Sequence, residues 1–336
     1  MTDERLAHEV ATAHAIGSGI GGAVARLDVA GAAVFVKRIP LSDLERRHPL
    51  STANLFDLPA FCQYGVGEVG SPGFGAWREL AANRMATDWV LAGRTAAFPL
   101  LHHWRVLPGA AAPPAEHADL TAAVAYWGGA PGVGDRLRAR AAATASIVLF
   151  QEYVPWTLDT WLHDRSAAGP DALAAAVGMV CRALVTDVGF MNDNELLHFD
   201  AHFSNVLTDG RRLYFADLGL ATSPAFALSA DERAFVAHHA THDRCYTQAQ
   251  LVNWLVTHAA GVPDTVARND YVRACAAGAA PAGLPAPLAA VVSRYARVAV
   301  VFNDFFWDLW GTSRTTPYPA ADAAREIEVA SRLPPS

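Results

Sequence analysis

The chain has 336 residues, of which 52% are apolar and 18% carry charged side chains, and its formal net charge is −7. This length and apolar content can bury a substantial core and suit two lobes better than one, whereas the negative charge argues against nucleic acid as a partner. The four cysteines form no CxxC pair or regular framework, which favours a reduced, cytoplasmic setting.

The amino-terminal region combines dense glycines with a β-rich run. The first five residues lack a positively charged region followed by an apolar run, so we expect no signal peptide. Glycines let the main chain lie close over phosphate groups without a side-chain clash. The residues that we expect to cover a phosphate chain are Gly17, Gly19, Gly21, Gly22 and Val24.

A second β-rich run ends at Lys37, whose ammonium can hold phosphates as a point charge. Such a lysine needs a carboxylate to hold it. Glu79 is the favoured partner, because it lies in a helix predicted over residues 76–92 from apolar residues at helical spacing. The rivals are Glu45, which follows the lysine by only eight residues, and Glu68, which lies in a Gly- and Pro-rich loop.

The middle of the chain contains the most informative segment. Residues 198–205 are His-Phe-Asp-Ala-His-Phe-Ser-Asn, and an Asp-Leu-Gly sequence begins at Asp217. Two short apolar runs around an Asp-Gly pair separate them and predict a hairpin. Phosphoryl transfer requires a carboxylate to orient the attacking hydroxyl and two oxygen ligands for magnesium. Asp200, Asn205 and Asp217 can supply these groups, so the spacing predicts a phosphoryl-transfer site.

The rest of the chain is predicted to be mainly helical. Helices are expected near residues 171–188, 230–240, 248–259 and 264–276. Residues 287–310 are apolar but contain four charged residues, so we expect a core helix and no membrane span. The Pro- and Ala-rich tail after Thr312 is predicted to fray.

Together these features resemble the protein-kinase-like superfamily over roughly residues 14–310. The matching features, in chain order, are the glycine-rich turn, Lys37, Glu79, a buried strand pattern at 147–155, the Asp200 and Asn205 segment, and Asp217-Leu218-Gly219. The resemblance implies an α+β, two-lobed protein-kinase-like fold. The N-lobe, residues 1–153, would contain a small antiparallel sheet and one helix, and the C-lobe, residues 154–336, would be mainly helical.

The resemblance also implies an enzyme, a kinase that uses ATP and Mg²⁺ to phosphorylate an alcohol group. In that family the lysine, paired with its glutamate, holds the phosphates, and Asn205 and Asp217 carry magnesium. Asp200 orients the acceptor hydroxyl and takes its proton, while His202 contacts the γ-phosphate or braces the loop.

The strand at 147–155 resembles the hinge between kinase lobes. The resemblance implies that adenine pairs with the main chain from Glu152 to Val154. It places Gln151 at the back of the nucleotide pocket.

Departures from the family pattern bear on the acceptor. Protein kinases usually have Arg and Lys where this chain has Phe199 and His202, and this pattern looks more like aminoglycoside and choline phosphotransferases. The short segment after Asp217 also lacks Ala-Pro-Glu. Both features favour a small-molecule hydroxyl. The glycine-rich turn and the strand ending at Lys37 look closer to eukaryotic-like protein kinases, so a Ser/Thr protein or peptide kinase is the alternative.

Two long insertions, at about 40–75 and 108–146, do not fit a minimal kinase. The first has enough Leu, Phe and Tyr to pack, so we expect it to be ordered. The second begins with an Ala- and Pro-rich stretch that reads as a linker, and Arg136, Arg138 and Arg140 are expected to form a solvated face. Either insertion could shape acceptor access or serve as decoration.

Two other functional classes stay open. A metal-dependent hydrolase would use the alternating His198, Asp200 and His202, with further ligands from 238–243, but this leaves Lys37 and the glycines unexplained. A pseudokinase would bind nucleotide as a scaffold without transferring phosphate. Against it, the chain contains all the residues that the chemistry needs.

Overall fold

The structure is a computed structural model that describes residues 2–19, 22–65, 67, 69–112 and 114–332. It is a mixed α+β protein whose chain divides into two compact units. The first unit takes in the described residues up to Val154 together with His198–Asp200 and Phe215–Phe235. The second contains Pro155–Leu197, Ala201–Tyr214 and the described residues from Val236 onward.

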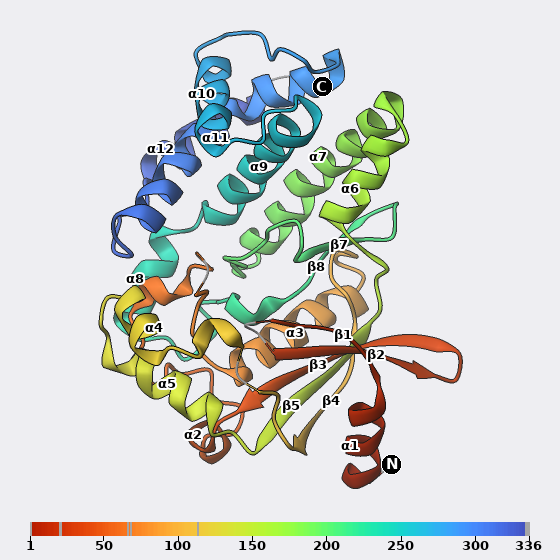
Figure 1. Ribbon diagram of the computed structural model, residues 1–336, viewed down its shortest axis with the longest axis vertical. Helices are drawn as coiled ribbons and strands as arrows, with labels where there is room; N and C mark the ends of the chain where they lie inside the picture. Colours follow the sequence, from red (N-terminus) through yellow and green to blue (C-terminus); the bar gives the residue numbers. More distant parts are fainter. Residues whose placement is uncertain (1, 20–21, 66, 68, 113, 333–336) are drawn as a thin grey trace. The chain divides into compact units, whose positions relative to one another are not determined.

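The first unit is built on an antiparallel sheet whose strand order, among the described residues, is β1-β2-β3-β5-β4 (Figure 1). Its strands are β1 (His14–Gly19), β2 (Gly22–Val29), β3 (Ala32–Leu41), β4 (Leu101–Pro108) and β5 (Ala145–Glu152). β5 lies between β3 and β4 and is buried along all but its last residue. This position explains its unbroken apolar sequence and confirms the strand predicted there.

Helix α3 (Ala76–Leu91) packs on this sheet and carries Glu79. Trp77 and Leu80 join buried residues of β3 and β5 in one apolar cluster. Burying each large apolar side chain stabilises the fold by roughly 1.5–3 kcal/mol. The chain leaves the helix at Gly93, whose φ of 68° is the left-handed conformation that glycine adopts without strain. The helix predicted over 76–92 is confirmed.

The amino terminus and the two insertions add further helices to the first unit. These are α1 (Asp3–Thr12), α2 (Asp43–Arg47), α4 (Leu120–Tyr126) and α5 (Pro131–Ala141), with the short 3₁₀ turns η1 (Ala60–Gln63) and η2 (Ala115–His117). The expectation of one helix beside the sheet is therefore wrong, because the insertions fold into helices of their own. The expectation that the first insertion is ordered is confirmed for its described residues.

Helix α5 contradicts the expected solvated arginine face. Arg136 is 2% exposed, and its Nη1 lies 2.8 Å from Oε2 of Glu45. Arg140 follows one turn later on the same side and donates to the carbonyl of Pro72. Arg138 is the exposed member of the three. Residues four apart share a helix face whereas residues two apart do not, so the outer arginines turn inward together.

The second unit is mainly helical (Figure 1). Its helices are α6 (Leu158–Ala167), α7 (Pro170–Asp193), α9 (His242–Trp254) with the π-helical turn η4 (Leu255–Ala259), α10 (Thr265–Ala276), α11 (Ala286–Gly311) and α12 (Ala320–Arg332). Helix α8 (Ala230–His238) contains the boundary between the units. A small sheet of β6 (Trp156–Thr157), β7 (Val206–Thr208) and β8 (Leu213–Phe215) confirms the predicted hairpin, formed by β7 and β8.

Helix α11 is the core helix predicted at 287–310. It packs against α9, α10 and α12, and its buried side chains include Tyr295 and Phe302. The prediction of a frayed tail is wrong for α12, because Arg297 of α11 bonds the buried Glu326 of α12 at 2.5 Å. Within the described part of the chain, α7 alone is long and apolar enough to cross a membrane. Its contacts with α6, α9 and α11 give that apolar face a packing role.

Candidate functional site

Lys37 lies at the centre of a three-residue ionic group in the first unit. β3 carries Lys37, α3 carries Glu79, and Asp217 lies two residues after β8. The Nζ atom of Lys37 is 2.7 Å from Oε1 of Glu79 and 2.7 Å from Oδ1 of Asp217. The lysine is 3% exposed and Glu79 is 4% exposed. The predicted pairing with Glu79 is confirmed, and Asp217 is a second partner that the sequence did not indicate.

Burial and opposite charge compete in this group. Burial disfavours the ammonium, but the charges of Asp217 and Glu79 outweigh it and raise the pKa of Lys37. Burial also raises the pKa of Glu79, with Lys37 opposing. For Asp217 the attraction of Lys37 outweighs burial, and the pKa of that carboxyl is lowered. The Asp217 side chain is 41% exposed, so water screens this pair more than the other.

Glu45, one of the two other carboxylates considered as partners of Lys37, has a different partner. Glu45 pairs with Arg136 and accepts the main-chain N–H of Ala76 at 2.9 Å, at the start of α3. This contact places a carboxylate at the helix amino terminus, where the positive end of the helix dipole stabilises the negative charge. Glu68 lies outside the described residues.

Asp217 has an unusual main-chain conformation. Its φ and ψ are 51° and 66°, in the left-handed region that Asp tolerates better than most side chains. Its Oδ1 also accepts the N–H of Gly219 at 3.3 Å. A Cβ atom at Gly219 would lie 3.1 Å from Oδ1 of Asp217 and 3.2 Å from Oε2 of Glu79. Glycine at 219 therefore lets the main chain pass close to both carboxylates.

His198 links the two acidic segments of the first unit. Nδ1 of His198 accepts the main-chain N–H of Asp200 at 3.3 Å, and Nε2 lies 2.9 Å from the carbonyl of Ala216. Because Nδ1 is an acceptor, we assign the ring proton to Nε2, which donates to that carbonyl. The ring is fully buried. His198 therefore ties the main chain beside Asp200 to the main chain beside Asp217, a bracing role.

The first insertion lies directly against Asp200. A Cβ atom placed on Gly65 would overlap Oδ1 of Asp200 and lie 2.8 Å from its Cγ. The ring of Tyr64 makes edge-to-face contacts with Phe199 and Phe235, with centroids 6.1 and 5.5 Å apart. Gly65 is not among the site residues predicted from the sequence. Its one available signal was the aromatic- and glycine-rich composition of the segment.

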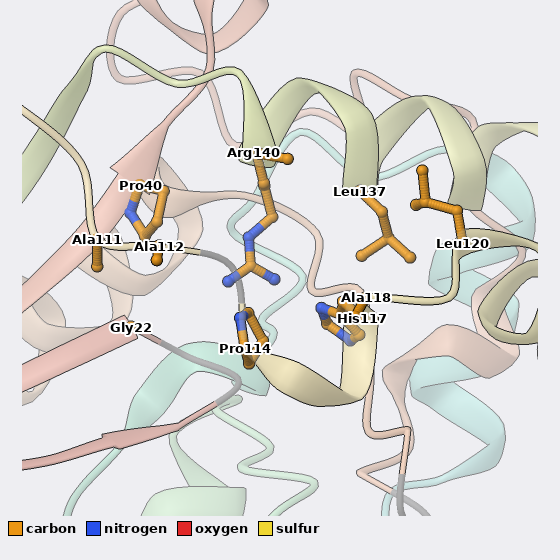
Figure 2. A pocket seen from close by; sticks show the side chains of 11 residues that line it. Gly22, Pro40, Ala111, Ala112, Pro114, His117, Ala118, Leu120, Leu137 and Arg140 are labelled. Carbon is orange, nitrogen blue, oxygen red and sulfur yellow. The ribbon is translucent and has the colours of Figure 1, made fainter.

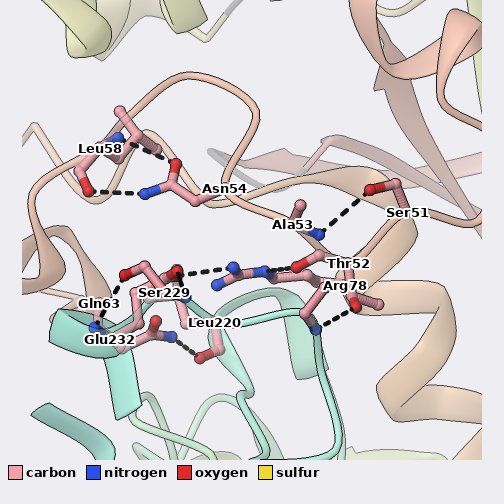
Figure 3. Close-up of polar contacts among 11 residues, drawn as sticks. Ser51, Thr52, Ala53, Asn54, Leu58, Gln63, Arg78, Leu220, Ser229 and Glu232 are labelled. Carbon is pink, nitrogen blue, oxygen red and sulfur yellow. Dashed lines mark hydrogen bonds and ion pairs between the residues drawn. The ribbon is translucent and has the colours of Figure 1, made fainter. Parts of the chain in front are cut away.

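Polar contacts fix the same insertion to the segment after Asp217 (Figure 3). The amide of Gln63 donates to the carbonyl of Leu220. Thr52 accepts the main-chain N–H of Ala227 at 2.8 Å through its hydroxyl. Its carbonyl accepts from Arg78 at 2.6 Å. Arg78 in turn lies 2.7 Å from Glu232, and both side chains are buried.

β1 and β2 pair with each other and contain the described residues of the glycine-rich segment. The paired residues include Gly17 with Val24 and Gly19 with Gly22, and Gly21 lies outside the described residues. A Cβ atom at Gly22 would overlap the carbonyl oxygen of Arg38 on β3, and the φ of Gly22 is 141°. The close approach of β2 to β3 therefore requires glycine at this position.

Gln151 and Glu152, two of the residues expected at a hinge, are the last residues of β5. Nε2 of Gln151 donates to Asn83 at 2.7 Å, and Asn83 donates to the carbonyl of Glu79 at 2.8 Å. The main-chain N–H of Glu152 donates to the carbonyl of Leu100 at 2.8 Å, so this donor is engaged. Val154 is buried. Gln151 therefore supports the helix that carries Glu79, and the adenine contact stays a prediction.

His202 and Asn205 belong to the second unit. The main-chain N–H of Asn205 donates to the carbonyl of His202 at 2.8 Å, which forms the turn that leads into β7. Nδ1 of His202 accepts the N–H of Ser204 at 3.2 Å. Their chemical roles stay predictions.

The histidines at 238–243, the further ligands considered for a hydrolase, lie around Tyr318 in the second unit. Nε2 of His238 lies 2.9 Å from the carbonyl of Tyr318, and the ring of His239 stacks on the tyrosine ring at 4.8 Å. His242 lies beside Asp243 at 3.4 Å. Across the described parts of the chain, no three His, Cys, Asp or Glu side chains converge as a metal site.

Comparison with models of known protein families gave no match, and neither did comparison with curated proteins.

Proposed function

We propose that this chain is an ATP- and Mg²⁺-dependent phosphotransferase with a two-lobed kinase-like fold, which moves the γ-phosphate to a hydroxyl group of a small molecule. The observation that carries the proposal is the buried Lys37 between Glu79 and Asp217. Such a group offers a fixed cation for phosphate oxygens beside an exposed carboxylate for a metal ion.

The donor set fits this cofactor pair. Mg²⁺ prefers carboxylate oxygens and retains several waters, which suits the partly exposed Asp217. The lowered pKa of Asp217 keeps its carboxylate ionised at neutral pH. When bound, the metal and nucleotide supply the phosphoryl group and neutralise its charge. Asn205 and His202 keep the roles that the sequence resemblance implies, as predictions.

In this proposal, the site residues of the first unit have different roles in phosphoryl transfer. Glu79 fixes the ammonium of Lys37, so that Lys37 meets phosphate oxygens without a large loss of side-chain entropy. Asp200 accepts the proton of the acceptor hydroxyl at a carboxylate oxygen. His198 holds the main chain of Asp200 from behind.

A small acceptor is favoured by the contacts of the first insertion. Polypeptide acceptors are commonly held by main-chain hydrogen bonds along an extended segment. After Asp217, the carbonyl of Leu220 and the N–H of Ala227 are already engaged by Gln63 and Thr52. The alternative, a Ser/Thr protein or peptide kinase, rests on the glycine-rich turn and the sequence before Lys37.

The test uses the purified full chain with labelled ATP and Mg²⁺. In one arm the protein is incubated with a metabolite extract, and in the other with a peptide library. We expect label in a small hydroxyl compound. Asp200→Asn should lower kcat by about 10²–10⁴-fold with nearly unchanged ATP affinity. Lys37→Ala should lower both kcat and the affinity for ATP. Asp164→Asn, on the exposed face of α6, is the matched control. Full activity in Asp200→Asn, or no transfer in either arm, would refute the proposal.

A further inference from the structure

The second insertion holds the main chain of the first insertion through side-chain hydrogen bonds. The acceptors are carbonyl oxygens in residues 69–73, which lie outside the helices and strands. The pairs of donor and acceptor residues are His117 with Val69, Trp127 with Gly70, Arg140 with Pro72 and Arg136 with Gly73, at 2.9, 2.8, 3.3 and 3.2 Å. Main-chain carbonyls that leave water need such donors. The second insertion therefore fixes the course of this segment.

The donors come from more than one element of the second insertion. His117 is the last residue of η2, Trp127 directly follows α4, and the two arginines are on α5. The side chains of His117 and Arg140 line the same pocket from η2 and α5 (Figure 2). Because a carbonyl can only accept, we assign the ring proton of His117 to Nε2. Several elements of the second insertion thus converge on one short segment.

Close packing joins the two insertions at the same place. The side chain of Trp127 is 1% exposed and stacks on the ring of Phe61, with centroids 6.3 Å apart. A Cβ atom placed on Gly132, near the start of α5, would overlap the carbonyl oxygen of Phe56. The main chains of the two insertions therefore approach so closely that a side chain at residue 132 has no room.

The held segment is connected in turn to Asp200. Oγ of Ser71 donates to the carbonyl of Cys62 in η1, and both residues are buried. Three residues after Cys62, Gly65 lies against the Asp200 carboxylate, since a Cβ at residue 65 would overlap Oδ1. A shift of the held segment would therefore reach Asp200 through Ser71 and Gly65.

We propose that the second insertion positions Asp200 through the first insertion, with Trp127 and His117 as positioning residues. The inference rests on the proposed phosphotransferase function, in which Asp200 takes the proton of the acceptor hydroxyl. Proton transfer and attack require the reacting groups to be aligned to within about 1 Å, so a small displacement of the first insertion slows transfer. The second insertion thus has a part in transfer to the acceptor and is more than decoration.

The first test is Trp127→Phe in the full chain, which removes the N–H donor and keeps an aromatic ring against Phe61. We expect kcat/KM for the acceptor found in the metabolite extract to fall about tenfold, because the arrangement that holds Asp200 loses one buried hydrogen bond. The Kd for ATP should be unchanged, since Trp127 contacts Gly70 and Phe61 of the first insertion. Arg138→Gln, which removes an exposed arginine from α5, is the matched control and should change neither value.

His117 allows a test of the donor itself. His117→Leu removes the donor to Val69, whereas the amide of His117→Gln can donate from nearly the position of Nε2. The His117→Leu variant should lose about tenfold in kcat/KM, and the His117→Gln variant should retain most of the wild-type value. Equal losses in the two variants would count against His117 as a positioning residue. Because the pocket beside His117 also includes Gly22, ATP affinity is compared only for Trp127→Phe.

Amide hydrogen exchange separates this inference from the proposed function. The N–H groups of Cys62, Tyr64 and Asp200 each donate a hydrogen bond, so their exchange with solvent measures local opening. In Trp127→Phe and His117→Leu, mass spectrometry of peptides that contain these residues should show faster exchange, with the overall fold retained by circular dichroism.

Two results would overturn the inference. One is unchanged exchange at Cys62 and Asp200 in both folded variants, and the other is a wild-type kcat/KM in Trp127→Phe despite faster exchange. Faster exchange in the variants of a chain whose wild type transfers no phosphate would refute the proposed function alone, and it would support the link between the second insertion and Asp200.

Discussion

The substitution Gly65→Ala tests whether the first insertion positions Asp200. Residue 65 lies outside the left-handed region of φ, so alanine is compatible with its main chain. The added Cβ would overlap Oδ1 of Asp200 and lie 2.8 Å from its Cγ, with Leu220 Cδ1 at 3.2 Å. The carboxylate must move to relieve this overlap, because the other side of the contact is main chain.

The size of the effect follows from that displacement. Restoring an ordinary contact of roughly 3.5 Å requires Asp200 to shift by about 1 Å. A misplacement of about 1 Å in a reacting group costs on the order of 10²-fold in rate. We therefore expect kcat/KM for the acceptor to fall about 10²-fold, with the free energy of unfolding lowered by about 1–3 kcal/mol from overpacking. ATP affinity should hold, because the atoms nearest to the added Cβ belong to Asp200 and Leu220 and not to Lys37 or its partners.

The assay is steady-state transfer to the acceptor identified in the metabolite extract, with ATP binding measured separately by calorimetry. Gly311→Ala is the matched control, because a Cβ at Gly311 meets no atom within 4 Å. A kcat/KM equal to that of the wild type in a folded Gly65→Ala variant would show that transfer does not depend on the position of Asp200 beside Gly65. Parallel losses of ATP affinity and turnover would instead indicate a general distortion of the first unit.

Three further substitutions probe buried or partly buried charges by urea unfolding, and for Glu79→Gln also by steady-state kinetics. Glu79→Gln should raise the KM for ATP. It should lower the free energy of unfolding by less than the roughly 3–5 kcal/mol expected for a buried charge left without any partner, because Lys37 keeps Asp217. Unchanged KM and stability would contradict this. Arg78→Met should cost about 3–5 kcal/mol by leaving Glu232 buried and unpaired, and wild-type stability would count against the pair. Burial raises the pKa of Asp187 to about 6. The pKa of Asp187 in the folded chain lies above the value of about 3.9 in the unfolded chain, so the free energy of unfolding falls as pH rises between these two values. Asp187→Asn should therefore add about 1–2 kcal/mol to the free energy of unfolding at pH 7, after allowance for solvent, and nothing below about pH 4. The same gain at both pH values would refute the raised pKa.

The elements with local signals could be predicted from the sequence. The strand that became β5, the helix α3 and the β7–β8 hairpin each carry their pattern within a dozen or so residues. The pairing of Lys37 with Glu79 was also predictable, because Glu79 lies on a well-marked helix whereas Glu45 follows the lysine too closely. Here local reasoning worked because the choice was among a few carboxylates on known elements.

Contacts between distant segments could not be predicted in this way. Gly65 reveals its role only beside Asp200, which lies far along the chain, and a glycine in a loop gives no sign of the side chain that it must accommodate. Arg136 and Arg140 illustrate a second difficulty, because composition alone predicts a solvated face. Their burial depends on Glu45 and on carbonyls of the first insertion.

The main chain around the two aspartates explains why the surrounding contacts are so extensive. Phe199 and Asp217 both have positive φ, 62° and 51°, and each such non-glycine residue costs of order 1–3 kcal/mol. Strain of this kind persists only where neighbouring contacts outweigh it. Phe199 is held by the rings of Tyr64 and Phe235, and Asp217 is held by Lys37, while His198 joins the two segments. The first insertion thus contributes to the same support as the ionic group, which is the physical reason to treat it as part of the site.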